Sequence, residues 1–199
     1  RKAWEMYTRP LWTSQQILPI LWVEKDALYP AVTQVADRYR VKVYQARGYS
    51  SYSQVYEAAR EFESANLSVV YLSDFDPSGE DMPRDVKERL EKYGAGQFSL
   101  KKLALTREQV RDYGLPPMPA KKSDPRFKTF VESYGDRAVE LDALPPDELE
   151  KIIVKEVENH IDPKTWNRDL EKIKKEKGRV RKLIQRLVEK SNENQNESK

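Results

Sequence analysis

Asp74 and Asp76 are separated by one residue and follow the apolar run VVYL, and Pro77 and Gly79 come soon after them. Pro and Gly at these positions predict that a strand ends here and the chain turns. Side chains at i and i+2 of an extended chain point the same way, so the two carboxylates are expected to lie close together. Such a pair repels unless a cation lies between them, and hard divalent cations prefer oxygen ligands. The pattern predicts half of a Mg²⁺ or Mn²⁺ site.

The elements that must position this pair alternate along the chain. Runs typical of strands lie at 18–23 and 41–45 and before the aspartates, and helical patterns lie between them at 28–39 and about 51–65. This β-α-β-α-β order predicts an α/β fold with a parallel sheet covered by helices. Downstream we expect a helix at 83–93, a strand at 98–105, a helix capped by Thr106 and ending at Gly114, a surface loop at 115–125, a helix at 126–134, a strand at 138–142, and helices from Pro145 to His160 and from Pro163 onward.

A third acid, Glu24, follows the first apolar run directly. In open α/β sheets, ligands bind beyond the carboxyl ends of the strands. Glu24, Asp74 and Asp76 all fall at that end, so we expect one cleft to hold all three. The alternative for each acid is turn chemistry, because Asp commonly caps helices. Asp26, which directly precedes a helical pattern, is interpreted as such a cap.

The acids and the turn between them resemble a known family. A strand that ends in Glu24, the turn Arg47-Gly48-Tyr49 and the sequence DFDPSG from Asp74 are similar to the Toprim domain, in the form found in the A subunit of topoisomerase VI and in the related meiotic double-strand-break protein. The segment from Val139 to His160 is similar to a later part of the same family, so the resemblance covers residues 19–163. It implies a Toprim-like, mostly parallel sheet flanked by helices.

The resemblance also implies chemistry. Asp74 and Asp76 would bind Mg²⁺ or Mn²⁺, and Glu24 would share the metal or serve as general acid/base in cleavage of DNA phosphodiester bonds. The family's nucleophile is a tyrosine on an upstream winged-helix domain, whereas here 23 residues precede Glu24 and the chain begins at Arg1. The nucleophile therefore stays open between water, as in a nuclease, and a tyrosine on a missing winged-helix domain, as in a topoisomerase. An ATPase subunit and a homodimer are the other implied partners.

Charge is uneven along the chain. The net charge is +3, yet residues 164–190 hold eleven Lys or Arg against four Asp or Glu. A basic segment beside an acidic site is expected of a protein that binds nucleic acid. The predicted DNA contacts are Lys25, Arg47, Lys174, Lys175, Arg179, Arg181 and Lys182. Each of these contacts has a structural alternative. Lys25 and Arg47 could form ion pairs with the acids, and the basic residues of 164–190 could be a solvated face of a helix.

The expected organisation has four parts. They are an N-terminal lead-in (1–17), the Toprim-like domain (18–163), a basic amphipathic C-terminal helix (164–190) with a heptad stripe that Gly178 interrupts, and a disordered tail (191–199). The chain has no cysteine and a single histidine, which excludes disulfides and two-histidine metal sites within it. Absent cysteine and the lack of an apolar run long enough for a membrane predict an intracellular, cytoplasmic protein.

Two other functions remain open. The first is a non-catalytic DNA-binding or partner-docking module whose acids hold a structural ion. The second is a phosphatase of the haloacid dehalogenase type, which also has an Asp-x-Asp pair after a strand. That family places the pair after its first strand, whereas Asp74 and Asp76 follow the third.

Overall fold

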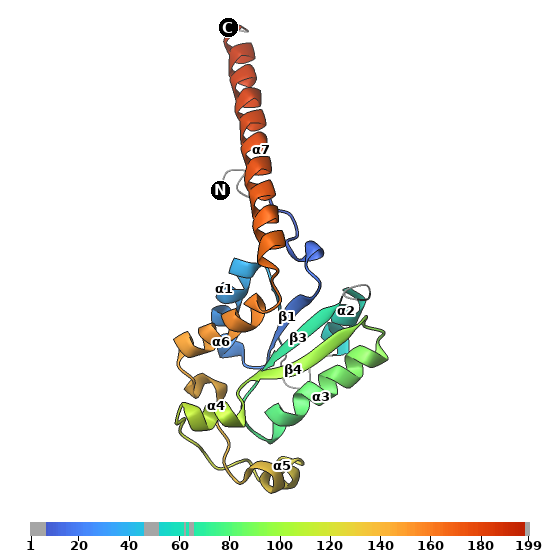
Figure 1. Cartoon of the computed structure of the whole chain (residues 1–199), viewed down its shortest axis with the longest axis vertical. Coiled ribbons are helices and arrows are strands. Elements are labelled where there is room, and N and C mark those ends of the chain that lie inside the picture. The colour runs from blue at the N-terminus through green and yellow to red at the C-terminus, as the bar shows by residue number, and fades with distance from the viewer. Residues whose placement is uncertain (1–6, 46–51, 62, 64–65, 198–199) are drawn as a thin grey trace. The chain divides into compact units, whose positions relative to one another are not determined.

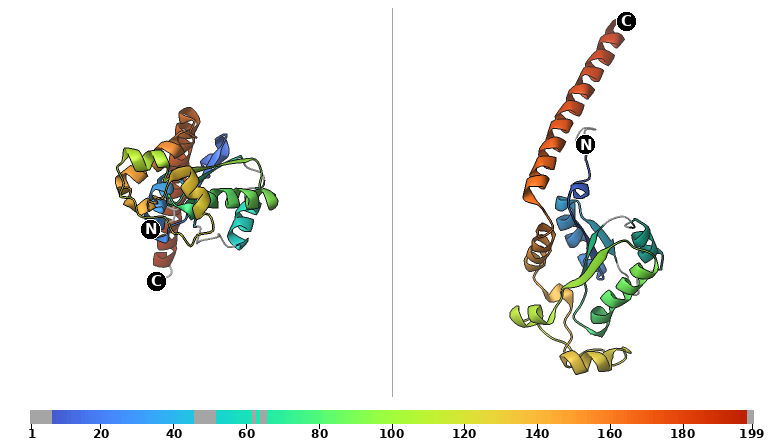
Figure 2. Two further views of the ribbon diagram at one scale, coloured as in Figure 1. Left: turned by 90° about the horizontal axis from the view of Figure 1, so that it is seen from below. Right: turned by 45° about the vertical axis from the view of Figure 1, so that its right-hand side comes forward.

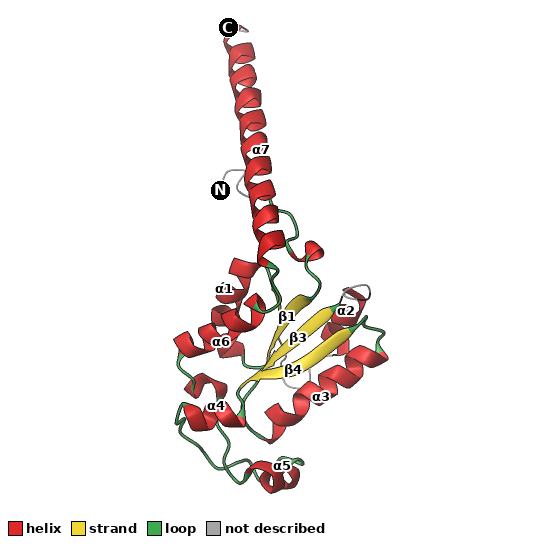
Figure 3. Cartoon of the chain, viewed as in Figure 1, coloured by secondary structure: helices red, strands yellow, loops and turns green. Residues whose placement is uncertain are grey.

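The computed structural model describes residues 7–45, 52–61, 63 and 66–197 of the chain. It divides into two compact units, one of residues 16–160 and one of residues 1–15 with 161–199. Figure 1 labels the elements, Figure 2 gives two further views and Figure 3 separates helices from strands by colour.

The larger unit is built on a sheet of four parallel strands in the order β2-β1-β3-β4. The strands are β1 (Leu18–Val23), β2 (Lys42–Gln45), β3 (Leu67–Leu72) and β4 (Phe98–Ala104). Both central strands are buried almost throughout, as expected of a parallel sheet with helices on both faces. The predicted α/β class is therefore confirmed.

Two helices cover each face of this sheet. On one face, α2 (Tyr52–Glu61) and α3 (Pro77–Lys92) pack together, and their apolar residues join side chains of β1 and β3 in one core that includes Trp22, Tyr71 and Met82. On the other face lie α1 (Tyr29–Tyr39) and α6 (Pro146–Glu158), which also contact each other (Figure 1). The central strands, which the acids follow, are thereby packed on both faces.

Helix α3 begins at Pro77, six residues before the start expected at residue 83, and Pro83 lies inside it. A proline inside a helix removes the hydrogen bond to the carbonyl four residues earlier, which here is that of Gly79. The buried hydroxyl of Ser73 donates to that carbonyl oxygen at 2.9 Å. A side chain from the preceding strand end thus replaces the missing backbone donor, and the helix continues through Pro83.

The segments after β4 lie beyond the carboxyl end of the sheet. They include α4 (Arg107–Asp112), which opens with a capping box of Thr106 and Gln109, and α5 (Phe127–Tyr134). The strand predicted at 138–142 is wrong: single antiparallel bridges join Val139 to Phe75 and Ala138 to Met118, and a 3₁₀ turn, η4 (Leu141–Ala143), follows. The alternation of apolar residues there reflects two isolated bridges rather than a place in the sheet.

The smaller unit centres on α7 (Pro163–Glu197), against which residues before the sheet pack. Trp12 meets Trp166 edge to face with ring centroids 5.2 Å apart, and Ser14 donates to Asp169 at 2.5 Å. The helix continues through Gly178 and past residue 191, where we expected a disordered tail to begin. Within the described residues, no helix is long and apolar enough to span a membrane.

Candidate active site

Glu24, Asp74 and Asp76 gather at the carboxyl ends of the neighbouring strands β1 and β3. The backbone N–H of Glu24 donates to Leu72 at 3.0 Å, which carries the pairing of these strands one residue past β1. The charges of Asp74 and Asp76 both raise the pKa of Glu24, so the three carboxylates are close enough to interact. The two strand ends therefore lie side by side, while the single cleft expected to hold all three acids and the roles assigned to them stay predictions.

Glu24 is the most perturbed acid of the group. Burial, followed by the charges of Asp74 and Asp76, raises its pKa to about 7, against the opposing effect of Lys102 and Arg126. Its Oε2 atom is buried and has no hydrogen-bond partner among the described residues. A buried carboxylate oxygen without a partner is costly and calls for a proton or a cation.

Asp74 is fixed by contacts from distant parts of the chain. Its Oδ1 accepts a hydrogen bond from the backbone N–H of Leu141 at 2.7 Å. Burial raises its pKa, while the Leu141 hydrogen bond and the charge of Lys25 oppose this. Its backbone also passes so close to Gly79 that a Cβ on that glycine would collide with the Asp74 carbonyl. The close approach explains why the Asp-x-Asp-Pro-x-Gly pattern ends in glycine.

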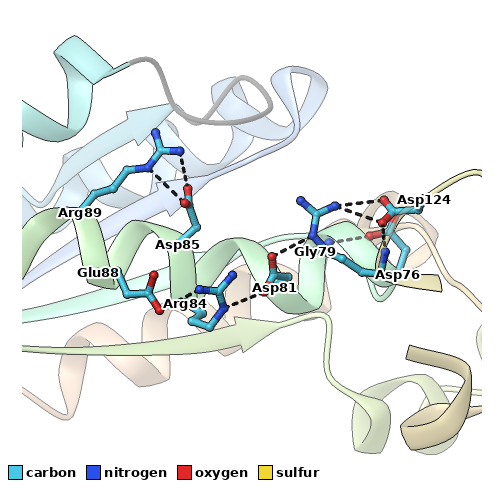
Figure 4. Close-up of polar contacts among 9 residues, drawn as sticks. Asp76, Gly79, Asp81, Arg84, Asp85, Glu88, Arg89 and Asp124 are labelled. Carbon is cyan, nitrogen blue, oxygen red and sulfur yellow. Dashed lines mark hydrogen bonds and ion pairs between the residues drawn. The ribbon is translucent and has the colours of Figure 1, made fainter. Parts of the chain in front are cut away.

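Asp76 caps helix α3. Its backbone is extended and its Oδ1 accepts a hydrogen bond from the Gly79 N–H at 2.6 Å (Figure 4). Pro77 occupies the first helical turn, where its missing N–H costs nothing. The turn-chemistry alternative therefore holds for Asp76, but the cap uses only one of its two carboxylate oxygens.

Lys102 of β4 is a site residue that the sequence analysis missed. Its side chain is 11% exposed, and its Nζ lies 2.7 Å from the Asp74 carbonyl oxygen and 2.5 Å from Glu80. Burial lowers its pKa, and the charges of Glu80, Asp76 and Glu24 oppose that shift. The sequence signal that could have found Lys102 is a lysine inside a predicted strand. In the structure this lysine lies opposite Tyr71 in the register of β3 and β4.

Lys25 forms ion pairs rather than standing free. Its Nζ lies 2.7 Å from both Glu140 and Asp142, which follow the Val139 bridge. This is the ion-pair alternative stated for Lys25; its binding to a phosphate stays a prediction. Asp26 is not the cap of α1, since the N-cap residue is Leu28; Asp26 instead accepts a hydrogen bond from Gln45 at 2.5 Å.

A row of ion pairs runs along the outer side of α3, as Figure 4 shows for Arg89 with Asp85 and for Arg84 with Asp81. At the end nearest Asp76, the guanidinium of Arg126 lies 2.8 Å from Asp81 and 3.1 Å from Asp124. Arg126 is 19% exposed and its charge lowers the pKa of Glu24. Arg126 therefore adds a second partly buried cation, besides Lys102, to the surroundings of the acid group.

A divalent cation fits the chemistry of this donor set, although the side chains are not yet gathered around one point. Among the described residues, no group of three or more acidic or histidine side chains is placed so that it could hold a metal ion as it stands. Asp74 and Asp76 each spend one oxygen on a backbone N–H, and Glu24 keeps an unpartnered oxygen. The unpartnered oxygen and the mutual repulsion are what a cation would relieve, so metal binding by these three acids stays a prediction.

The remaining predicted DNA contacts lie elsewhere. Arg47 lies outside the described residues. The five cations predicted on the C-terminal helix are exposed on α7 and belong to the smaller unit: Lys174, Lys175, Arg179, Arg181 and Lys182.

Neither a comparison with known protein families nor a comparison with curated proteins finds a match to this chain.

Proposed function

We propose that the unit of residues 16–160 acts on phosphodiester bonds of DNA with the help of Mg²⁺ or Mn²⁺, as the resemblance to the Toprim domain implies. The observation that carries the proposal is the buried, unpartnered Oε2 of Glu24 beside two further carboxylates at the ends of adjacent strands. Such an arrangement destabilises the metal-free protein, which makes sense where a cation is to be bound.

Asp74, Asp76 and Glu24 are the residues that would hold the cation. When bound, a divalent cation neutralises charge that develops on the phosphate and orients its oxygens. Glu24, with a pKa near 7, is also suited to exchange a proton near neutral pH. The Leu141 N–H fixes the Asp74 carboxylate, and Lys102 fixes the Asp74 backbone, so this side chain is held in place before any substrate arrives.

The test uses substitutions that keep the structural contacts. Asp76→Asn retains an N-cap of equal strength, Asp74→Asn retains the acceptor for Leu141, and Glu24→Gln keeps the shape of the side chain. Glu91→Gln is the matched control, because it removes one acid from an exposed position at the other end of α3. Mn²⁺ binding is followed by calorimetry, and cleavage is followed with supercoiled plasmid in Mg²⁺ or Mn²⁺.

We expect the three site variants to lose Mn²⁺ binding and cleavage while Glu91→Gln keeps both. Cleavage that leaves free DNA ends identifies water as the nucleophile, and protein attached to the ends identifies a tyrosine. Site variants that bind Mn²⁺ and cleave like the unchanged protein would refute the proposal.

One observation favours the non-catalytic alternative: Asp74 and Asp76 both already hold backbone N–H groups and so have structural roles. DNA binding that survives all three substitutions, with no cleavage in any metal, would establish this DNA-binding or docking module instead. The phosphatase alternative gains no support, because the acid pair follows β3 and not the first strand.

A further inference from the structure

An open pocket of about 680 Å³ lies in the larger unit between α4, α5 and the segment that follows α5. Helix α4 comes directly after β4, so the pocket belongs to the end of the sheet where the strands stop; Figure 1 shows α4 and α5 there. Its lining includes Phe75, Tyr134 and three arginines, Arg107, Arg111 and Arg137. None of these was singled out as a site residue by the sequence analysis.

The pocket carries an excess of positive charge. Glu108 is the single acid in its described lining, against three guanidinium groups. Arg111 pairs with Asp112 at 2.8 Å, whereas the side chains of Arg107 and Arg137 form no ion pair or hydrogen bond with another described residue. Hydrogen bonds with its own backbone N–H and with the Thr106 side chain lower the pKa of Glu108, and the charges of Arg111 and Arg107 add to this. The acid is therefore ionised, and the excess in the lining is two positive charges.

The two unpaired arginines stand on well-anchored backbone. Arg107 is the first residue of α4 and lies between Thr106 and Gln109, the two residues of the capping box. The Gln109 side chain also donates to the Leu103 carbonyl at 2.9 Å. Arg137 immediately precedes Ala138, which exchanges two 2.8 Å backbone hydrogen bonds with Met118. Cations held on fixed backbone lose little freedom when they bind an anion.

The pocket adjoins the acid group through shared residues. Phe75 lies between Asp74 and Asp76 in the chain, and Tyr134 packs edge to face against it with centroids 5.3 Å apart. Tyr134 also lines a second pocket together with Glu80, the ion-pair partner of Lys102. One wall of the pocket is thus continuous with the residues that hold Asp74.

We propose that this pocket binds a backbone phosphate of the nucleic-acid strand that the acid group acts on, at a position along the strand other than the bond to be cleaved. Guanidinium groups match phosphate oxygens in geometry and stay charged, and the partly exposed ring of Tyr134, packed on the buried Phe75, offers an apolar surface to the adjoining sugar or base. The identity of the ligand as a strand rests on the proposed function; the anion site itself rests on the pocket.

The test measures DNA binding under conditions in which no metal-dependent cleavage can occur. The double variant Arg107→Gln with Arg137→Gln is compared with Lys87→Gln plus Lys92→Gln, which removes the same charge from exposed positions of α3. Affinity for a 20-base-pair duplex in EDTA is measured over a range of salt, and the amide signal of Gly114, in the pocket lining, is followed by NMR. A thymidine monophosphate titration separates a free nucleotide from a strand.

We expect the arginine double variant to bind duplex about tenfold more weakly, or weaker still. The slope of its log affinity against log salt should be smaller by about one, the value for one lost phosphate contact. The lysine pair should stay close to the unchanged protein, and duplex should shift the Gly114 signal at concentrations where the mononucleotide does not.

The proposal would be overturned if both double variants lost the same amount of duplex affinity, or if the arginine double variant lost none. It would also be overturned by an unshifted Gly114 signal or by preferential binding of the mononucleotide. The proposed function fails by a different readout, the absence of metal-dependent cleavage in a protein that still binds duplex through the pocket.

Discussion

The ammonium group of Lys102 contacts the backbone of Asp74 and not its carboxylate. Its Nζ lies 2.7 Å from the Asp74 carbonyl oxygen and 2.5 Å from a Glu80 oxygen. The lysine therefore holds the chain that carries the acid while it leaves the carboxylate of Asp74 to other partners.

Lys102→Met should destabilise the protein by about 2 kcal/mol, because it removes the cation that pairs with the partly buried Glu80. Adding Glu80→Gln should recover much of that loss. Lys92→Met, on the exposed end of α3, should have little effect. Urea unfolding of the four proteins checks this; a double variant no more stable than Lys102→Met would show that the pair is not the cause.

The raised pKa of Glu24 predicts a pH-dependent stability in the metal-free protein. Between its ordinary pKa of 4.5 and its folded value of about 7, the folded state binds more protons at this position than the unfolded state. Stability should therefore fall as pH rises through that window, by roughly 3 kcal/mol from this group.

Urea unfolding in EDTA at pH 5 and at pH 7.5 measures this difference, with Glu24→Gln as the control in which the decrease should be largely absent. Mn²⁺ should restore stability at pH 7.5, because it favours the ionised form. An unchanged decrease in Glu24→Gln would assign the effect to another group.

Gly79→Ala should destabilise the protein by about 2 kcal/mol or more, because its Cβ would collide with the Asp74 carbonyl and one of the two must shift. Gly178→Ala is the matched control, since Gly178 lies inside α7 with open space around it. The control should instead stabilise the protein, by about 0.5–1 kcal/mol. Thermal unfolding separates the two; a neutral Gly79→Ala would contradict the close approach.

Ser73→Ala should cost about 1–3 kcal/mol, because the Gly79 carbonyl would lose the donor that stands in for the missing N–H of Pro83. In the background of Pro83→Ala, residue 83 can donate that hydrogen bond itself, so the same serine substitution should cost clearly less. The coupling free energy from this double-mutant cycle measures the replacement directly, and additive effects would refute it.

The basic face of α7 should supply sequence-independent affinity for DNA. Changing the exposed residues Lys174, Lys175, Arg179, Arg181 and Lys182 to Gln should flatten the salt dependence of binding without affecting Mn²⁺ binding. Measuring the mass in solution at the same time tests the competing idea of a dimerisation helix. An unchanged salt slope with a dimer converted to a monomer would show that the helix serves assembly.

The parts of the site that the sequence could predict are those set by local pattern. Strand ends and parallel order place Glu24 and Asp74 at one edge, and both follow from apolar runs and turn residues. The parts that could not be predicted depend on long-range contacts. The Leu141 N–H reaches Asp74 from 67 residues away, and Lys102 becomes a site residue only once β4 lies beside β3.

Local signals can also compete, and the start of α3 shows how. Pro77 and Pro83 both suit a first helical turn, and only the hydroxyl of Ser73, which comes from outside the helix, allows the earlier start. No periodicity in the sequence encodes that contact. The arginine pocket was missed for a similar reason, since its cations come from segments separated by about 30 residues of the chain.

The double hydrogen bond between Phe75 and Val139, at 2.8 and 2.9 Å, has a consequence for synthesis on the ribosome. A nascent chain that has emerged as far as β4 contains every strand of the sheet and all three acids. It still lacks the residues that hold the Asp74 loop, because Val139 and Leu141 come more than thirty residues after the end of β4. The strands can therefore pair before the acids acquire their final positions. In a growing polypeptide, Asp74 is held in place only after Val139 has bonded to Phe75 and Leu141 to Asp74.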